Sequence, residues 1–280
     1  MNAKSGVLWV VATPLGNPGD LSPRAREVLS TVSLVLCEDT RRAARLFKEC
    51  GLSKGRLLSF HDHNEEGRVS RALEHLAARE DAALISDAGT PVVSDPGYLL
   101  ARAAREAGYR VSPVPGPSAV MAALCAAGIA PYPFVFMGFL PRKAGDVRQA
   151  FGRFAGVGCT LVFFERKDRL AKSLAVAQET LGERECVIAR EMTKTHEEFI
   201  AGRLSEFAGR EFDLLGEITV VIGPAIEKPV AQAPDVERVI AEELRLGGRP
   251  KEVSRRVAAR LPGAAVKDLY ERIIRQGKIL

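Results

Sequence analysis

The sequence predicts an α/β protein of two α/β domains followed by a small, basic helical appendage. Three observations lead to this class. Strand and helix patterns alternate as far as residue 223, which is typical of a mostly parallel sheet covered by helices. A Pro/Gly-rich junction at residues 115–118 divides the alternating series in two, and a proline-containing segment at 227–234 ends it. We therefore expect domains at residues 1–116, 117–226 and 235–280.

The first domain should begin with an apolar strand, and a helical pattern follows most of its later strands. Ser22 and Pro23 indicate a helix start, because serine caps helix N-termini and proline suits the first helical position. The expected strands are 7–12, 34–37, 56–60, 82–86 and 110–114, and the helices after the first are 40–49, 65–79 and 98–107.

The second domain should carry a more antiparallel sheet, because its last strands follow one another without long helices between them. The expected strands are 134–139, 160–164, 186–190, 198–201 and 218–222. The expected helices are 118–127, 147–154, 168–181 and the short 203–207.

Composition limits the class of protein. A hydrophobic content of 46% and a charged content of 27% are ordinary for a globular protein in water. No apolar run is long enough to span a membrane, and the amino-terminal stretch lacks the pattern of a signal peptide. The five cysteines are scattered and never form CxxC, so we expect free, mostly buried thiols in a reducing cytoplasm.

The carboxyl-terminal appendage holds the positive charge of the chain. Residues 245–280 contain ten Lys or Arg and three Asp or Glu, whereas the whole chain has a net charge of only +5. Three helical patterns at 235–246, 250–261 and 264–276 present this charge, which indicates contact with a polyanion such as RNA. The alternative is a solvated basic surface. The candidate RNA-binding residues are Arg249, Lys251, Arg255, Arg256 and Arg260.

The segment DAALISDAGTPVVSDPG (81–97) is the most informative loop. A short apolar strand leads into twelve residues rich in Asp, Gly and Pro, and the next helix begins only near Tyr98. Loops between a strand and a helix usually need 2–6 residues. Because ligands of open α/β sheets bind at the carboxyl ends of the strands, this loop predicts a binding site.

Two other polar loops could suggest a dinucleotide site and a metal site, but the spacing of their residues disfavours both. The first strand ends in TPLGNPGDLS (13–22), whose Gly16-x-x-Gly19 spacing with interleaved prolines does not match a dinucleotide fingerprint. His61-Asp62-His63-Asn64-Glu65 could suggest a metal site, but in an extended segment His61 and His63 point one way and Asp62 the other, and the only further histidine at ligand spacing is His75 on a helix. We interpret it as a substrate-facing loop and expect no metal.

Eight motifs in order carry a resemblance to a known family. They are TPLGNPGDLS (13–22), EDTR (38–41), FHDHNE (60–65), SDAGTPVVSDPG (86–97), PGPSA (115–119), GFLPRK (138–143), FFERKDRL (163–170) and AREMTKTHEE (189–198). From about residue 6 to 223, and more loosely in the tail, the chain resembles the tetrapyrrole methylase superfamily, and within it the branch that modifies ribosomal RNA.

The resemblance implies the two-domain fold of class III S-adenosylmethionine (SAM) methyltransferases, with SAM between the domains, and a homodimer. It also implies 2′-O-methylation of a cytidine in the decoding region of 16S rRNA, presented as RNA or as the 30S subunit. Thr90-Pro91 stands where tetrapyrrole-modifying relatives have Asp-Pro, which agrees with the RNA branch. The residues implied to bind SAM are Leu15, Asp87, Ala88, Gly89, Thr90, Val93, Ser118, Ala119, Phe164 and Glu165.

Methyl transfer to a ribose hydroxyl requires alignment of the reacting atoms and benefits from a group that takes or steers the proton. The candidates at strand ends are Asp39, Glu191 and Lys194, with Glu38 and Asp95 beside them, and Arg41 could hold an RNA phosphate. A salt bridge or a helix cap explains each of these residues equally well. Two other functions remain open: methylation of a tetrapyrrole carbon, and RNA binding by a non-catalytic ribosome-assembly factor.

Overall fold

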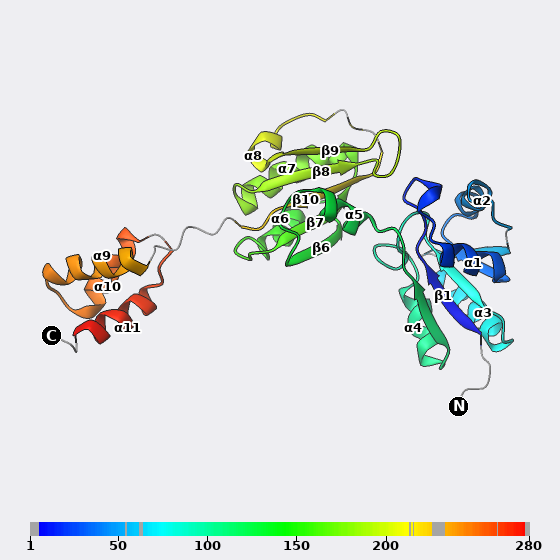
Figure 1. The fold of residues 1–280 in the computed structure, drawn as a ribbon, viewed down its shortest axis with the longest axis horizontal. Helices are drawn as coiled ribbons and strands as arrows, with labels where there is room; N and C mark the ends of the chain where they lie inside the picture. Colours follow the sequence, from blue (N-terminus) through cyan, green and yellow to red (C-terminus); the bar gives the residue numbers. More distant parts are fainter. Residues whose placement is uncertain are drawn as a thin grey trace. The chain divides into compact units, whose positions relative to one another are not determined.

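The computed structural model describes most of the chain and divides it into two compact units, Met1–Ala225 and Ile226–Leu280 (Figure 1). The first unit contains two β-sheets with their helices, which we call the first lobe and the second lobe in chain order. The second unit contains helices alone. The described residues are 6–53, 55–61, 64–212, 214, 216–225, 233–261 and 263–277.

The first sheet is parallel throughout, with strand order β3-β2-β4-β1-β5. All carboxyl ends of its strands therefore lie along one edge, where the loops after β1, β2 and β4 lie together. Its strands are β1 (Val7–Val11), β2 (Leu34–Cys37), β3 (Arg56–Ser59), β4 (Ala82–Ile85) and β5 (Arg110–Val114). Its α-helices are α1 (Pro23–Thr31), α2 (Thr40–Glu49), α3 (Glu65–Ala77) and α4 (Tyr98–Glu106), with a single 3₁₀ turn η1 (Pro18–Asp20) before α1.

Both faces of this sheet are buried, which is why β2 and β4 are continuous apolar runs. Successive side chains of a strand point to opposite faces, so Val35 packs with α1 and α2 while Leu36 packs with α3 and α4. As expected, Ser22 caps α1: its hydroxyl accepts a hydrogen bond from the Ala25 amide, and Pro23 occupies the first turn.

The second sheet has the order β6-β7-β10-β8-β9, and among its neighbours only β6 and β7 run parallel. The prediction of a more antiparallel second sheet is confirmed. Its strands are β6 (Phe134–Phe139), β7 (Thr160–Glu165), β8 (Glu185–Arg190), β9 (Glu198–Arg203) and β10 (Ile218–Ile222). Its helices are α5 (Ala119–Ala126), α6 (Ala144–Gly152), α7 (Lys167–Leu181) and α8 (Leu204–Phe207).

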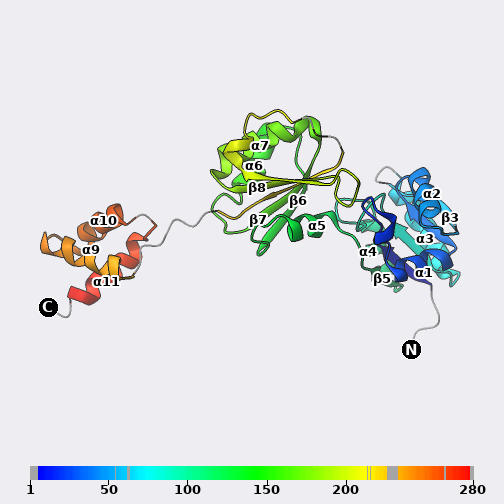
Figure 2. The same cartoon turned by 45° about the horizontal axis from the view of Figure 1, so that its top comes forward.

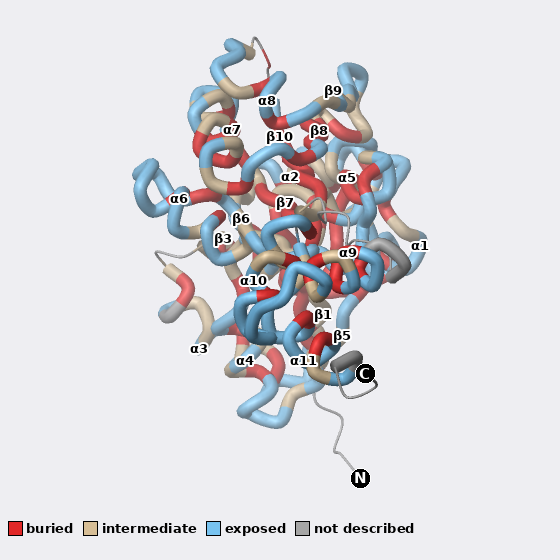
Figure 3. Tube along the Cα trace, turned by 90° about the vertical axis from the view of Figure 1, so that its left-hand side faces the viewer, coloured by how far each residue is buried: buried red, intermediate tan, exposed pale blue. Residues whose placement is uncertain are grey.

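The helices of the second sheet are unevenly divided between its faces. Helices α6, α7 and α8 cover one face, and α5 covers the other (Figure 2). Helix α6 begins at Ala144, three residues before the expected start, because its first turn is exposed and shows no apolar periodicity. In Figure 3 the buried residues follow the strands and the inner sides of the helices.

The carboxyl-terminal unit consists of α9 (Ala233–Arg245), α10 (Pro250–Arg260) and α11 (Val266–Gly277). Its three predicted helices are confirmed. They enclose a small core of their own that includes Ile240, Val257 and Ile273. The linker expected at 227–234 lies largely outside the described residues.

The five cysteines are free, as expected, and all but Cys125 are buried. Among the described residues no helix combines the length and the apolar character that crossing a membrane requires.

Candidate functional site

The loop after β1 and the long loop after β4 are held together at Gly89. The Thr13 amide donates to the Gly89 carbonyl at 2.8 Å, and the Gly89 amide donates back to the Thr13 carbonyl at 3.0 Å. Gly89 has φ +79°, and a Cβ there would lie 3.1 Å from Cδ2 of Leu15. Leu15 therefore packs directly over a backbone position that favours glycine.

The long loop is also tied to the segment that joins the two sheets. The Thr90 hydroxyl donates to the Pro117 carbonyl at 3.0 Å. Ser118 then caps α5, and Ala119 packs in the same apolar cluster as Phe164 from β7. The structure thus places Leu15, Gly89 and Thr90 beside the segment that leads into Ser118 and Ala119, and Ala119 packs in one cluster with Phe164.

Phe164 and Glu165 lie on opposite faces of the second sheet. Phe164 packs on the α5 face, whereas the Glu165 side chain is fully buried on the α7 face. There it accepts hydrogen bonds from the Ser173 hydroxyl at 2.5 Å and the Arg166 amide at 2.9 Å, and it lies 3.5 Å from Arg169. Only the backbone of Glu165 is therefore placed to meet a ligand that contacts Phe164.

The Asp87 side chain contacts the loop after β2 and the start of α2. Its carboxylate accepts from the Asp39 amide at 3.3 Å and lies 3.1 Å from the Arg42 guanidinium. Burial raises the pKa of Asp87. Val93, further along the loop, is 48% exposed.

Two loops of the site hold strained backbone. Val92 and Ser94 in the long loop have φ +75° and +68°, and Glu191 and Thr193 after β8 have φ +48° and +67°. Left-handed conformations of this kind cost about 1–3 kcal/mol for residues other than glycine, and they cluster at functional sites. Both loops were singled out from sequence for their polar residues.

Asp39 is a weak proton acceptor in this structure. It caps α2, and its carboxylate accepts from the Arg41 amide at 2.8 Å and from the Arg41 guanidinium at 2.8 Å. These hydrogen bonds hold the pKa of Asp39 well below its usual range. The Arg41 side chain remains 90% exposed, so its outer edge is open to solvent.

Lys194 and Glu191 form an ion pair in the loop after β8. The Lys194 ammonium lies 3.0 Å from Glu191 and 3.1 Å from Glu217. Burial alone would lower the pKa of Lys194, but the two carboxylates outweigh it and raise that pKa. Lys194 therefore stays protonated at neutral pH and acts as a cation rather than a base.

Lys194 also joins the two parts of the site. A Cβ on Gly16 would lie 2.3 Å from Cγ of Lys194, so the loop after β1 touches the loop after β8. The two lobes also come close at Gly138 in β6, where a Cβ would lie 3.1 Å from the Ser94 hydroxyl oxygen of the long loop. Our sequence reasoning missed Gly138, although a glycine inside a strand pattern often marks a close approach.

Asp95 is a candidate to take up a proton. It lies in the long loop beside Ser86, Glu38 and Asp87. Burial, together with the neighbouring Glu38 carboxylate, raises the pKa of Asp95 to about 6. A pKa near the working pH is what an effective general base needs.

The five basic residues of the carboxyl-terminal unit that were predicted to contact RNA fall into two groups. Arg256 donates to Glu243 at 2.8 Å, and Arg260 donates to Glu243 at 2.9 Å and to Glu242 at 2.7 Å, so both hold α10 against α9. Sequence could not separate these two from the rest because their partners lie on another helix. Arg249, Lys251 and Arg255 are exposed and form no ion pair with any residue that the structure describes, whereas Arg260 is exposed but paired.

Across the described part of the chain no three His, Cys, Asp or Glu residues form a group that could hold a metal ion. Asp62 and His63, which suggested a metal site in the sequence, lie outside the described residues.

Three comparisons place the chain among known proteins. The sequence model of the family Tetrapyrrole (Corrin/Porphyrin) Methylases matches residues 7–208. Ribosomal RNA small subunit methyltransferase I of Pseudomonas aeruginosa is 42% identical over 98% of this chain and 99% of the relative. The protein of that name from Xylella fastidiosa is 41% identical over 95% of this chain and 98% of the relative.

Among solved structures, uroporphyrin-III C-methyltransferase from Thermus thermophilus complexed with S-adenyl homocysteine has a TM-score of 0.57. It is 23% identical, and the match covers 78% of this chain and 97% of that chain, which supports the shared fold. Because both the family match and the near-full-length relatives agree, the chain belongs to the tetrapyrrole methylase family, in its ribosomal RNA small subunit methyltransferase I group.

Proposed function

We propose that this chain transfers a methyl group from SAM to the 2′-hydroxyl of a cytidine in the decoding region of 16S rRNA. The observation that carries the proposal is the contact between loops of the two lobes, where Gly16 approaches Lys194 and Ser94 approaches Gly138. The names of the relatives supply the substrate class.

The residues around Gly89 fit SAM in chemistry. Leu15, Ala119 and Phe164 offer apolar contacts for an adenine ring, and the backbone of residues 87–90 offers hydrogen-bonding groups at close range because Ala88 and Gly89 are small. When bound, SAM supplies a methyl group on a positively charged sulfur. The strained loop at Val92 and Ser94 fixes this surface before the ligand arrives.

The chain's own contribution to the reaction is alignment and proton transfer. The Asp95 carboxylate accepts the proton of the ribose hydroxyl as the oxygen bonds to the methyl carbon and the carbon–sulfur bond breaks. The protonated Lys194, held by Glu191 and Glu217, presents a positive charge to the RNA backbone beside this site. Asp39 positions Arg41 for the same purpose.

Two further proposals concern partners. In the carboxyl-terminal unit, the exposed residues Arg249, Lys251 and Arg255 bind RNA phosphates. Arg256 and Arg260 instead hold α10 against α9 through Glu243 and Glu242. The chain acts in the cytoplasm as a homodimer, as expected for its family. Light scattering on the purified protein measures the oligomeric state, and a monomer at working concentration would contradict the dimer.

Incubation with labelled SAM and three substrates tests the proposed function. We expect transfer of label to 16S rRNA or to assembled 30S subunits, and none to uroporphyrinogen. Transfer to uroporphyrinogen alone would support a tetrapyrrole methyltransferase. RNA binding without transfer to any of the three would support a non-catalytic assembly factor.

A further inference from the structure

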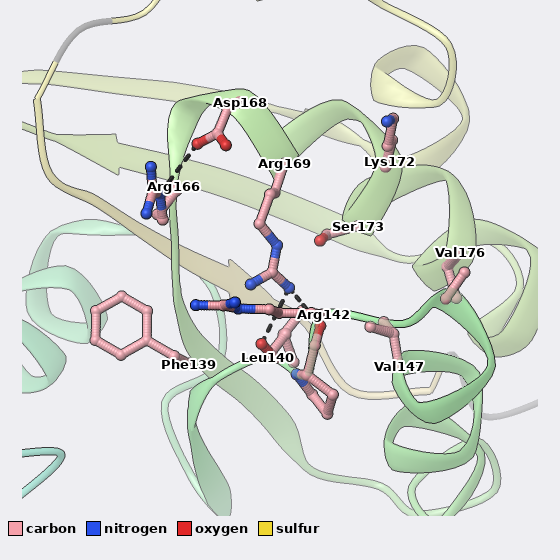
Figure 4. A pocket seen from close by; sticks show the side chains of 12 residues that line it. Phe139, Leu140, Arg142, Val147, Arg166, Asp168, Arg169, Lys172, Ser173 and Val176 are labelled. Carbon is pink, nitrogen blue, oxygen red and sulfur yellow. Dashed lines mark hydrogen bonds and ion pairs between the residues drawn. The ribbon is translucent and has the colours of Figure 1, made fainter.

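A pocket of about 740 Å³ opens on the second lobe, beside the site already described (Figure 4). It lies between the loop that follows β6 and the first turns of α6 and α7. The side chains that line it come from the GFLPRK motif (138–143), from the FFERKDRL motif (163–170) and from the turns that follow them. Its polar lining is Arg142, Arg166, Asp168, Arg169, Lys172 and Ser173.

Two of the four basic side chains in this pocket are already engaged. Arg166 pairs with Asp168 at 3.1 Å. Arg169 donates to the Leu140 carbonyl at 3.0 Å and to the Pro141 carbonyl, and it lies 3.5 Å from the buried Glu165 carboxylate. Arg169 therefore holds the β6–α6 loop in place, and its charge is largely offset.

The positive charges of Arg142 and Lys172 are not neutralised by a nearby acidic side chain. Neither forms a hydrogen bond or an ion pair with any other residue that the structure describes, and Arg142 is exposed. Figure 4 shows the guanidinium end of Arg142 on the side of the pocket where Phe139 lies. Helices α6 and α7 both begin at the pocket without a side-chain cap, so their N-terminal dipoles add to the positive potential.

An exposed aromatic ring connects the pocket to the transfer site. Phe139 is 58% exposed, and its ring centroid lies 5.4 Å from that of Phe164 in an edge-to-face contact. The preceding residue, Gly138, is the one that approaches Ser94 of the long loop. An exposed ring next to uncompensated cations is the combination that proteins use to bind single-stranded nucleic acid, through stacking and charge.

We propose that this pocket binds a phosphodiester group of the RNA substrate adjacent to the methylated nucleotide, with a neighbouring base stacked on Phe139. Arg142 and Lys172 contact the phosphate, and Arg169 holds the loop that carries Arg142. A phosphodiester fits better than a small free anion because the pocket is open and far larger than one phosphate group. This inference rests on the proposed function and assigns residues that contact its substrate.

The test compares two double variants that remove the same charge. Arg142→Ala with Lys172→Ala removes the two free cations of the pocket. Lys48→Ala with Arg153→Ala removes one exposed lysine and one exposed arginine that lie outside the pocket lining. Binding of a short single-stranded fragment of 16S rRNA is followed by fluorescence anisotropy across a salt titration, and SAM affinity is measured by calorimetry.

We expect the pocket variant to bind RNA roughly tenfold more weakly than wild type, because hydrogen bonds to charged groups contribute that much. The slope of log affinity against log salt should become shallower by about 0.7 for one lost phosphate contact. SAM affinity should remain unchanged in both variants. A third variant, Phe139→Leu, should weaken RNA binding without changing the salt slope, since leucine keeps the apolar bulk but cannot stack.

Several results would overturn the inference. If the two double variants lost RNA affinity equally, the effect would come from overall charge and not from the pocket. If the pocket variant lost SAM affinity, the pocket would belong to the cofactor site. Lys172 can also be modified chemically in the presence of inorganic phosphate or of the RNA fragment. If phosphate protected Lys172 and the RNA fragment did not, the pocket would be a site for a free anion. If wild type bound no RNA at all, the proposed function would fail with it, whereas normal RNA methylation by the pocket variant would reject this inference alone.

Discussion

The two lobes of the α/β unit contribute to the candidate site in different ways. The first lobe offers mostly backbone, with the side chains of Leu15, Arg41 and Asp95 beside it. Its parallel sheet gathers the loops after β1, β2 and β4 at one edge, and hydrogen bonds between Thr13 and Gly89 join two of these loops. The second lobe offers side chains, namely Phe164, Lys194 and the residues of the cationic pocket. We infer that the first lobe mainly holds the methyl donor and the second mainly holds the RNA.

The strongest test of this division is Gly89→Val. The substitution places a branched side chain at φ +79° and against Leu15, so we expect SAM binding to be lost, with a decrease of at least about 100-fold in affinity. Calorimetry measures it. Gly108→Val is the matched control, because Gly108 has φ +82° but no atom within 4 Å of the position that a Cβ would take. Similar SAM affinity in the two folded variants would remove Gly89 from the site.

Asp95→Asn should show the next largest effect. Loss of a general base lowers the rate of transfer by about 10²–10⁴-fold, and SAM affinity should be retained. Because the base must be ionised, wild-type activity should rise with pH through the Asp95 pKa of about 6 and then level off. The variant should lose that step in its pH–rate profile. An unchanged profile in the variant would assign the step to another group.

Lys194→Ala should lower RNA methylation by roughly tenfold, since it removes one charge-assisted contact at the meeting point of the two lobes. Lys194→Arg should restore part of the activity because it keeps the charge. Steady-state kinetics should place most of the loss in the KM for RNA. A loss confined to SAM affinity would contradict the division between the lobes.

The smallest effects are expected in the carboxyl-terminal unit. Lys251→Ala with Arg255→Ala should weaken RNA binding a few-fold and leave thermal unfolding unchanged, because both side chains are exposed. Arg256→Ala should instead lower the melting temperature of this unit, since it breaks the contact with Glu243. If Arg256→Ala weakened RNA binding without changing the melting temperature, the role assigned to Arg256 in holding α10 against α9 would be wrong.

Local sequence patterns predicted most of the fold. The apolar runs LVLC (34–37) and AALI (82–85) are strands buried on both faces, as their short length and flanking turn residues indicate, and Ser22-Pro23 marked the start of α1. The loops of the site followed from their position after such strands. The helix α6 was placed three residues late, because an exposed first turn carries no apolar signal.

Side-chain partners across elements could not be predicted in the same way. Phe164 and Glu165 were expected in one pocket, yet alternation along β7 sends the Glu165 side chain to the face covered by α7. Arg256 and Arg260 looked available for RNA until α9 brought Glu243 beside them. The pocket around Arg142 and Lys172 exists only because α6 and α7 begin side by side.

The central claim is that a ribose 2′-hydroxyl receives the methyl group, and replacing that hydroxyl tests it most directly. Two RNA fragments of identical sequence, one with cytidine and one with 2′-deoxycytidine at the target position, are incubated with labelled SAM under single-turnover conditions. We predict full transfer to the cytidine fragment and none to the deoxycytidine fragment, with equal binding of the two. Transfer of label to the deoxycytidine fragment at a comparable rate would contradict the account.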